Sequence, residues 1–172
     1  MKIPQSLFLA HPIYKDERGG LELLHCPTSP FFNVSSEYNT SPTQVLLSKT
    51  NPYTGRGLHF QKKHPLFQVI SVIDGEITEC LVQRKNKNGS LEACSQKIKS
   101  TDKNNTFMVP AGWAHGFYTL EKPATLLYLV WGERRIEDES GLNLKSTTFN
   151  FLDKSLKNKI KLNERDAEYE YI

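Results

Sequence analysis

The sequence predicts an all-β protein, built as a sandwich or a barrel. Short segments rich in β-branched and aromatic residues recur along the chain, and residues typical of turns separate them. Such regularly spaced short strands indicate two packed sheets or one closed sheet. Only residues 150–161 have a helix-like composition. The expected strands are Phe67–Ile73, Glu76–Val82, Thr106–Val109, His115–Leu120 and Thr125–Trp131.

The first two of these strands are separated by Asp74-Gly75. This pair of residues tolerates the positive φ angles that a two-residue hairpin turn requires. The sequence therefore predicts that residues 69–73 fold back onto residues 76–81.

The last expected strand, Leu126–Trp131, is apolar on both faces, as is typical of a strand buried on both sides. Tyr128 lies within it, and a buried tyrosine hydroxyl needs a hydrogen-bond partner. The helix expected at 150–161 is followed by the charged run 163–166. The prediction is a β domain with a short helical segment near its C-terminus.

Length and composition limit the classes of protein to consider. A chain of 172 residues suits one domain covering 1–172, and 38% hydrophobic residues supply a core. The 22 Lys and Arg exceed the 19 Asp and Glu by three. This surplus is too small to indicate nucleic acid as a partner, but it suits a small anionic ligand.

The chain gives no sign of a membrane protein. Its apolar runs fall short of the roughly 18 residues of a membrane span, and Leu7–Ala10 is too short for the core of a secretory signal. We therefore expect a cytoplasmic protein with no membrane partner. Three widely spaced cysteines fit reduced thiols better than disulfides or a zinc site: Cys26, Cys80 and Cys94.

Two segments combine histidine with glycine. In Arg56–Gln61, a kink at Gly57 would be needed to bring Arg56 and His59 to the same side of a strand. In Pro110–Phe117, a Pro/Gly turn leads His115 into the next strand.

A metal site is not expected from these histidines. Metal sites in β-barrels commonly use a His-x-His pair, which places both rings on one face of a strand. His64 follows His59 at the wrong parity, and His115 stands alone in its segment. A single histidine can still act as a general base when a carboxylate fixes its tautomer, although a buried, hydrogen-bonded structural role is the alternative for any one of them.

Four stretches stand in order along the chain: Asp16–Glu22, Arg56–Gln61, Pro110–Phe117 with Tyr128, and Leu162–Asp166. In order and separation they resemble the dTDP-4-dehydrorhamnose 3,5-epimerase family, the sugar-nucleotide epimerases of the cupin superfamily. The resemblance implies a double-stranded β-helix (jelly-roll) subunit that forms a homodimer and needs no metal or other cofactor. Such enzymes invert C3, C5 or both in nucleoside-diphosphate 4-keto-6-deoxyhexoses.

By this resemblance, His59 is the catalytic base, Asp166 its carboxylate partner and Tyr128 the acid on the opposite face of the sugar. His115 resembles a second active-site histidine. The residues that resemble binders of the nucleotide and diphosphate are Arg18, Glu22, Gln44 and Arg56.

The chemistry agrees with these roles. A proton α to a ketone is weakly acidic, so its removal needs a positioned base and stabilisation of the enolate. Inversion then needs a proton from the other face, which a tyrosine on a rigid buried strand can deliver. The planar guanidinium of arginine engages phosphate oxygens better than lysine does.

Three departures from the family surround the expected pocket. Glu133 and Arg134 stand where the family has adjacent tyrosines, and Gln68, which we expect to face the sugar, stands where it has a lysine. Gln44 is no longer followed by Asp-Asn. Unchanged catalytic residues in an altered pocket indicate a different sugar or nucleotide, or inversion at one centre only.

Two other functions stay open. A cupin 3,4-ketoisomerase also uses a histidine and tyrosine to move protons, and a non-catalytic cupin would only bind a sugar nucleotide. The segment Arg56–Gln61 and Asp166 favour epimerisation, which would serve the biosynthesis of deoxysugars or surface polysaccharide.

Overall fold

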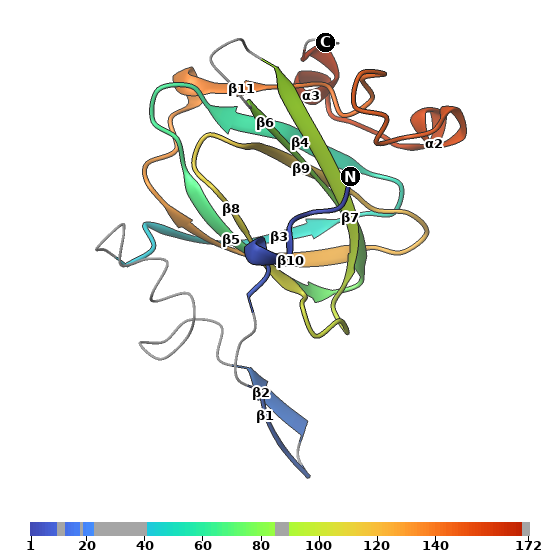
Figure 1. Cartoon of the computed structure of the whole chain (residues 1–172). Coiled ribbons are helices and arrows are strands. Elements are labelled where there is room, and N and C mark those ends of the chain that lie inside the picture. The colour runs from blue at the N-terminus through green and yellow to red at the C-terminus, as the bar shows by residue number, and fades with distance from the viewer. Residues whose placement is uncertain (10–12, 18, 23–40, 85–89, 170–172) are drawn as a thin grey trace.

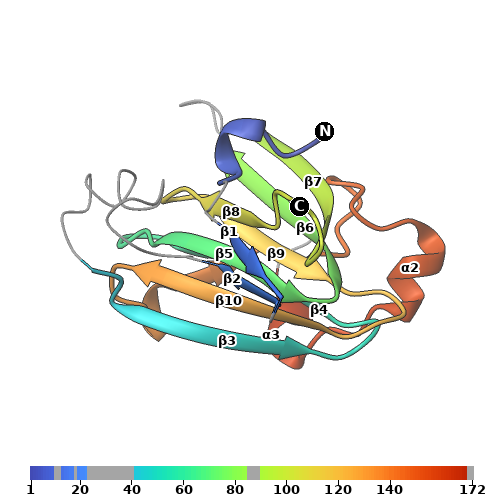
Figure 2. The same cartoon turned by 90° about the horizontal axis from the view of Figure 1, so that it is seen from below.

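Two antiparallel sheets form the body of the protein. The computed structural model describes residues 1–9, 13–17, 19–22, 41–84 and 90–169 (Figure 1). The four-stranded sheet contains, in order, β3 (Gln44–Thr50), β10 (Ala124–Trp131), β5 (Phe67–Asp74) and β8 (Thr106–Val109). The five-stranded sheet contains β11 (Glu139–Gly141), β4 (Gly55–Gln61), β9 (Ala114–Tyr118), β6 (Glu76–Arg84) and β7 (Leu91–Lys99). The five-stranded sheet lies above the four-stranded sheet in Figure 1, and Figure 2 views the molecule from below, from the side of the four-stranded sheet. The predicted all-β class is confirmed.

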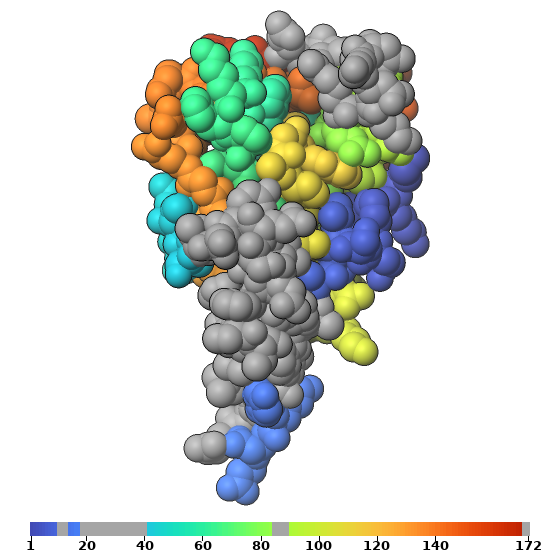
Figure 3. Space-filling view, turned by 60° about the vertical axis from the view of Figure 1, so that its left-hand side comes forward, coloured from blue at the N-terminus to red at the C-terminus, as the bar shows by residue number. Residues whose placement is uncertain are grey.

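Smaller elements flank these sheets. They are the hairpin of β1 (Ile13–Asp16) and β2 (Gly19–Glu22), the 3₁₀ turns η1 (Gln5–Leu7) and η2 (Ile136–Asp138), and the helices α2 (Lys154–Lys159) and α3 (Glu164–Glu168). The hairpin stands away from the body of the molecule (Figure 3). In the part of the chain described, no helix has the length and apolar content to cross a membrane.

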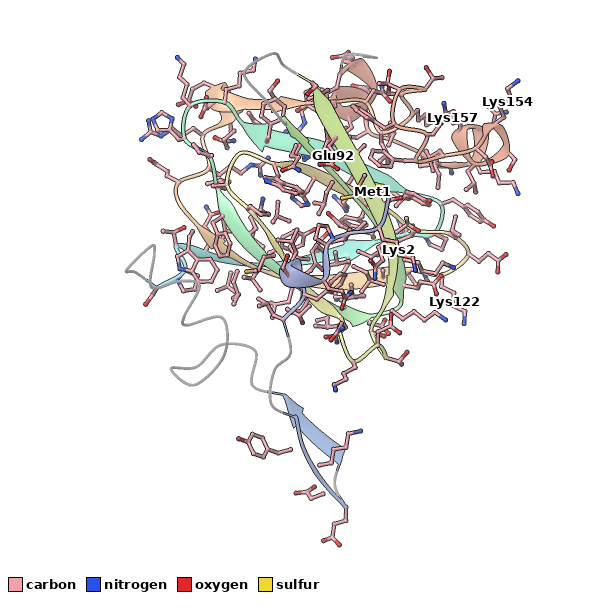
Figure 4. All side chains as sticks on the ribbon, viewed as in Figure 1. Met1, Lys2, Glu92, Lys122, Lys154 and Lys157 are labelled. Atoms are coloured by element: carbon pink, nitrogen blue, oxygen red, sulfur yellow. The ribbon has the colours of Figure 1, made fainter. Side chains whose placement is uncertain are left out.

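Among the described residues, apolar side chains form three clusters, which together explain why both faces of several strands are apolar. Ile70, Phe117 and Leu126 belong to the cluster that both sheets share. A second cluster packs the five-stranded sheet against the C-terminal segment, and a third covers β5 and β10 around Trp131. Side chains fill the space between the sheets, while charged ends such as that of Lys154 lie at the periphery (Figure 4).

The hairpin predicted at Asp74-Gly75 is wrong. Strand β5 pairs with β10 and β8, whereas β6 pairs with β9 and β7, so the two strands belong to different sheets. Gly75 has the expected positive φ of 79°, and a Cβ atom there would lie 2.2 Å from the carbonyl oxygen of Pro123. The pair therefore forms a corner between sheets, because neighbouring strands already occupy both edges of β5.

The C-terminal segment confirms the predicted helix at 150–161 in part, because α2 occupies only its middle, residues 154–159. The charged run that follows does not simply end this helix. It begins a separate helix, α3, in which Asn163 is the N-cap and accepts a hydrogen bond from the backbone N–H of Asp166 at 2.7 Å. This cap fixes the place of Asp166 in the fold.

Candidate active site

One cavity of about 590 Å³ gathers most of the predicted site residues. Its walls come from both sheets and from the C-terminal segment. Seven of the nine residues expected from the sequence line it: Gln44, Arg56, His59, Gln68, His115, Tyr128 and Asp166. Of the other two, Arg18 lies outside the described residues, and Glu22 is described only as part of the backbone of β2.

The predicted kink at Gly57 is confirmed. Arg56 pairs with Phe117 and His59 pairs with His115, so β4 has one residue more than β9 in this interval. Gly57 has φ +91°, and a Cβ atom there would lie 2.6 Å from the carbonyl oxygen of His115. The resulting bulge lets Arg56 and His59 line the same cavity, although they are three residues apart.

His59 and Asp166 form a hydrogen-bonded pair. The Nε2 atom of His59 lies 2.8 Å from Oδ1 of Asp166, and Oδ2 accepts the backbone N–H of Gly57 at 3.0 Å. Burial alone would raise the pKa of Asp166, but the hydrogen bonds from His59 and Gly57 and the charge of Arg165 hold that pKa below its ordinary value. An ionised Asp166 accepts the Nε2 proton, which leaves Nδ1 of His59 with a lone pair for a substrate proton.

Two further contacts hold this pair in place. The ring of Tyr169 meets the ring of His59 edge-on, with 5.7 Å between centroids. The backbone carbonyl of Ala167, on α3, accepts a hydrogen bond from the Asn143 side chain at 2.9 Å. His59 is therefore supported both by its carboxylate partner and by packing.

Tyr128 is a protonated, enclosed hydroxyl. Burial and the nearby negative charge of Glu79 raise the pKa of Tyr128 far above its ordinary value, and Arg56 offsets this only in part. Its side chain is 9% exposed and lines the cavity. The expected hydrogen-bond partner is not found among the described residues, so the hydroxyl is available to a ligand.

The guanidinium of Arg56 is held in place by two hydrogen bonds. Its Nε donates to the Thr50 hydroxyl at 2.9 Å, and Nη2 donates to the carbonyl oxygen of Lys49 at 3.1 Å. The other N–H groups of the guanidinium take no part in these two hydrogen bonds. Lys49 lines the same cavity. This arrangement suits phosphate oxygens.

Sequence reasoning missed three charged residues of this region. Glu139, which is 7% exposed, is ion-paired with both Arg134 and Arg165. Arg165 also lies 3.3 Å from Nε2 of His59 through its Nη2 atom. The third is Glu79, whose Oε1 lies 3.1 Å from Nδ1 of His115.

A sequence signal for Glu79 did exist. It stands between Ile77 and Leu81 at the inward positions of β6, where alternation predicts an apolar residue. Burial raises the pKa of Glu79, and the contact with His115 lowers it in part. Within the described ranges, no three His, Cys, Asp or Glu side chains gather into a group that could hold a metal ion.

Comparison with known proteins places this site in a family. The model of the family described as dTDP-4-dehydrorhamnose 3,5-epimerase matches residues 1–172. The chain belongs to this family. Its predicted double-stranded β-helix is confirmed by solved family structures, such as the dTDP-4-dehydrorhamnose 3,5-epimerase of Elizabethkingia anophelis, with a TM-score of 0.76 at 20% identity over 98% of this chain and 94% of that one.

Two other members of the family are similar to this chain. A dTDP-4-dehydrorhamnose 3,5-epimerase of Methanothermobacter thermautotrophicus is 34% identical over 88 residues, or 51% of this chain and 47% of its own length. The match thus spans about half the length of that relative. An epimerase of Legionella pneumophila, solved in complex with dTDP-4-keto-L-rhamnose, has a TM-score of 0.74 at 23% identity over 92% of this chain and 82% of that one.

Proposed function

We propose that this family member epimerises C3, C5 or both in a nucleoside-diphosphate 4-keto-6-deoxyhexose. The observation that carries the proposal is that the His59–Asp166 pair and the protonated Tyr128 line one cavity. A base and an acid in one enclosed site are what inversion at a carbon next to a ketone requires.

In the proposed reaction, Nδ1 of His59 takes the proton from the carbon next to the ketone. The electron pair of the broken C–H bond forms the enolate, and its negative charge lies on the ketone oxygen. Tyr128 donates its hydroxyl proton to the opposite face of that carbon and later regains a proton from water. His59 releases its proton to solvent, so each turnover exchanges a carbon-bound hydrogen with water.

Arg56 and Lys49 are the proposed contacts for the diphosphate. The guanidinium is fixed by Thr50 and by the carbonyl oxygen of Lys49, and the ammonium of Lys49 lies on an exposed side chain. A dTDP-sugar bound to the Legionella relative supports a nucleotide sugar as the ligand class.

The sugar or the nucleobase is proposed to differ from those of the named relatives. Gln68 lines the cavity where the family has lysine, and Arg134, ion-paired with Glu139, lines it where the family has tyrosine. These changes alter the hydrogen-bonding groups around the ligand and leave the catalytic pair and Tyr128 in place. A different sugar or nucleotide, or inversion at one centre only, is therefore part of the proposal.

We also propose that the working form is a cytoplasmic homodimer. The hairpin β1–β2 stands away from its own body, and the edge strand β3 exposes Val45 and Leu47 at 60% and 55%. A second copy could cover both features. The free, buried thiols of Cys80 and Cys94 support a reducing compartment.

Proton NMR of dTDP-4-keto-6-deoxyglucose in D₂O tests the reaction. We expect loss of the C3 or C5 proton signal with the protein and none with His59→Ala. If neither the dTDP-sugar nor its CDP and GDP counterparts exchange protons, the proposal is wrong and a binding-only cupin is favoured. A product with its keto group at C3 would instead identify a 3,4-ketoisomerase.

A further inference from the structure

Glu79 is a buried charged side chain that the proposed reaction does not yet use. It is 0% exposed, and its Oε1 lies 3.1 Å from Nδ1 of His115. Its second oxygen, Oε2, has no hydrogen-bond partner in the described part of the chain. An isolated carboxylate in such a place is costly, so its pairing with His115 needs a reason.

His115 connects Glu79 with the cavity. Its side chain lines the cavity, and its ring lies 6.3 Å from that of Tyr128, measured between centroids. Since Nδ1 faces Glu79, the other ring nitrogen, Nε2, points away from the carboxylate. Glu79 therefore determines which edge of the imidazole is presented to a ligand.

We propose that Glu79 is a positioning residue that orients His115 so that its Nε2–H donates a hydrogen bond to the ketone oxygen of the substrate. This inference rests on the proposed function and extends it. The pair holds one proton between Nδ1 and Oε1 and a second on Nε2, so it is neutral overall, as its closed surroundings favour.

The proposal supplies a stabiliser for the enolate. When His59 removes the carbon-bound proton, the electron pair moves onto the ketone oxygen, and the hydrogen bond from Nε2 strengthens as charge develops there. Of the arginines that line the cavity, Arg134 and Arg165 pair with Glu139, and Arg56 is the proposed contact for the diphosphate. Gln68, where the family has lysine, brings no charge.

The surroundings of the pair contain few competing charges. On β7, Gln96 lies directly opposite Glu79, and its Oε1 also has no hydrogen-bond partner among the described residues. The thiols of Cys80 and Cys94 interact with Glu79, and burial raises the pKa of each thiol above its ordinary value, so both stay neutral. His115 is therefore the one described basic side chain that contacts the Glu79 carboxyl group.

Two substitutions test the proposal. Glu79→Gln keeps the shape and a hydrogen-bonding oxygen but removes the charge, so we expect kcat for proton exchange to fall roughly 10- to 100-fold with KM changed less than about twofold. Glu76→Gln is the matched control on the same strand, outside the cavity, and should keep kcat within about twofold. Equal kcat in Glu79→Gln and wild type would overturn the proposal.

A second readout does not depend on the substrate. In ¹⁵N-histidine-labelled wild type, we expect a downfield proton signal on Nδ1 of His115, which His115→Asn would identify by its loss. Glu79→Leu, an apolar replacement between Ile77 and Leu81, should remove that signal. If the signal is absent from wild type or unchanged in Glu79→Leu, the pairing is refuted, even if the epimerase activity itself is found.

Discussion

Two pairs of histidine and carboxylate, each with its histidine lining the cavity, have opposite surroundings. The His59 side chain is 25% exposed, and its partner Asp166 also accepts a backbone N–H. The His115 side chain is 11% exposed, and its partner Glu79 is fully buried with one oxygen unpartnered. An open histidine with an ionised partner is suited to take up a proton and release it to water, whereas an enclosed pair is suited to hold a hydrogen bond in a fixed direction.

The largest effect on the exchange rate is expected from a change in the more exposed pair, His59 and Asp166. Asp166→Asn keeps an oxygen for the Gly57 N–H but removes the charge that fixes the tautomer of His59. We expect the exchange rate to fall roughly 10²- to 10⁴-fold. Proton NMR of samples quenched at successive times in D₂O measures the exchange rate. Retention of more than a tenth of the wild-type rate would show that Asp166 is not the partner of the base.

Tyr128→Phe should separate proton removal from inversion. His59 could still exchange the substrate proton with deuterium on its own face, but the opposite face would lack a donor. We therefore expect deuterium incorporation into the unchanged sugar, while formation of the epimer falls roughly 10²- to 10⁴-fold. Equal losses of exchange and inversion would place Tyr128 in proton removal instead.

The two carboxylates should have opposite effects on stability as the pH changes. The pKa of Asp166 is lowered by folding, so its charge stabilises the protein at neutral pH, and this contribution disappears as the pH falls through that lowered value. The pKa of Glu79 is raised by burial, so the stability that its protonated form provides is lost as the pH rises through the raised value.

Thermal unfolding of amide variants measures this difference. We expect Asp166→Asn to lower Tm at pH 7, with a smaller difference from wild type near pH 3. For Glu79→Gln, the Tm relative to that of the wild type should be higher at pH 8 than at pH 4. If the Tm difference from wild type changed with pH in the same direction for both variants, the two carboxylates would not have opposite pKa shifts.

The smallest effect is expected from the packing that supports the open pair. Tyr169→Leu removes the edge-on contact with His59 and leaves every hydrogen bond of the pair in place. Such contacts contribute about 0.5–1.5 kcal/mol, which corresponds to roughly a two- to tenfold decrease in kcat. Tyr53→Leu, at a half-buried tyrosine that does not line the cavity, is the control for loss of a tyrosine. An equal decrease of kcat in both variants would show that Tyr169 has no specific role.

Local patterns predicted the β class and several strands because side-chain type follows burial on each strand. The pairing of strands was not predictable in the same way. Asp74-Gly75 has the backbone freedom of a hairpin, but the occupied edges of β5 turn it into a corner between sheets. That outcome depends on strands distant in the sequence, which no local pattern contains.

The same distinction between local and distant residues applies to the site. Arg56 and His59 were identified from one short segment, and the need for a kink at Gly57 followed from their spacing. The pairing of His59 with Asp166 came from the family resemblance, because 107 positions separate the two residues. Glu79 was missed because its partner, His115, lies 36 positions away on the neighbouring strand β9, and no local pattern joins the two residues.

The bulge at Gly57 also sets a length. The bulge shifts the alternation of side chains along β4 and so places Arg56, the proposed contact for the diphosphate, and His59, the proposed base, in the lining of one cavity at a fixed interval. In a ligand, the distance between the phosphate group and the reacting carbon must therefore match the distance between Arg56 and His59. The spacing of these two residues thus selects ligands by length. In a sugar joined to its nucleoside through one phosphate, the reactive carbon would not be aligned with His59.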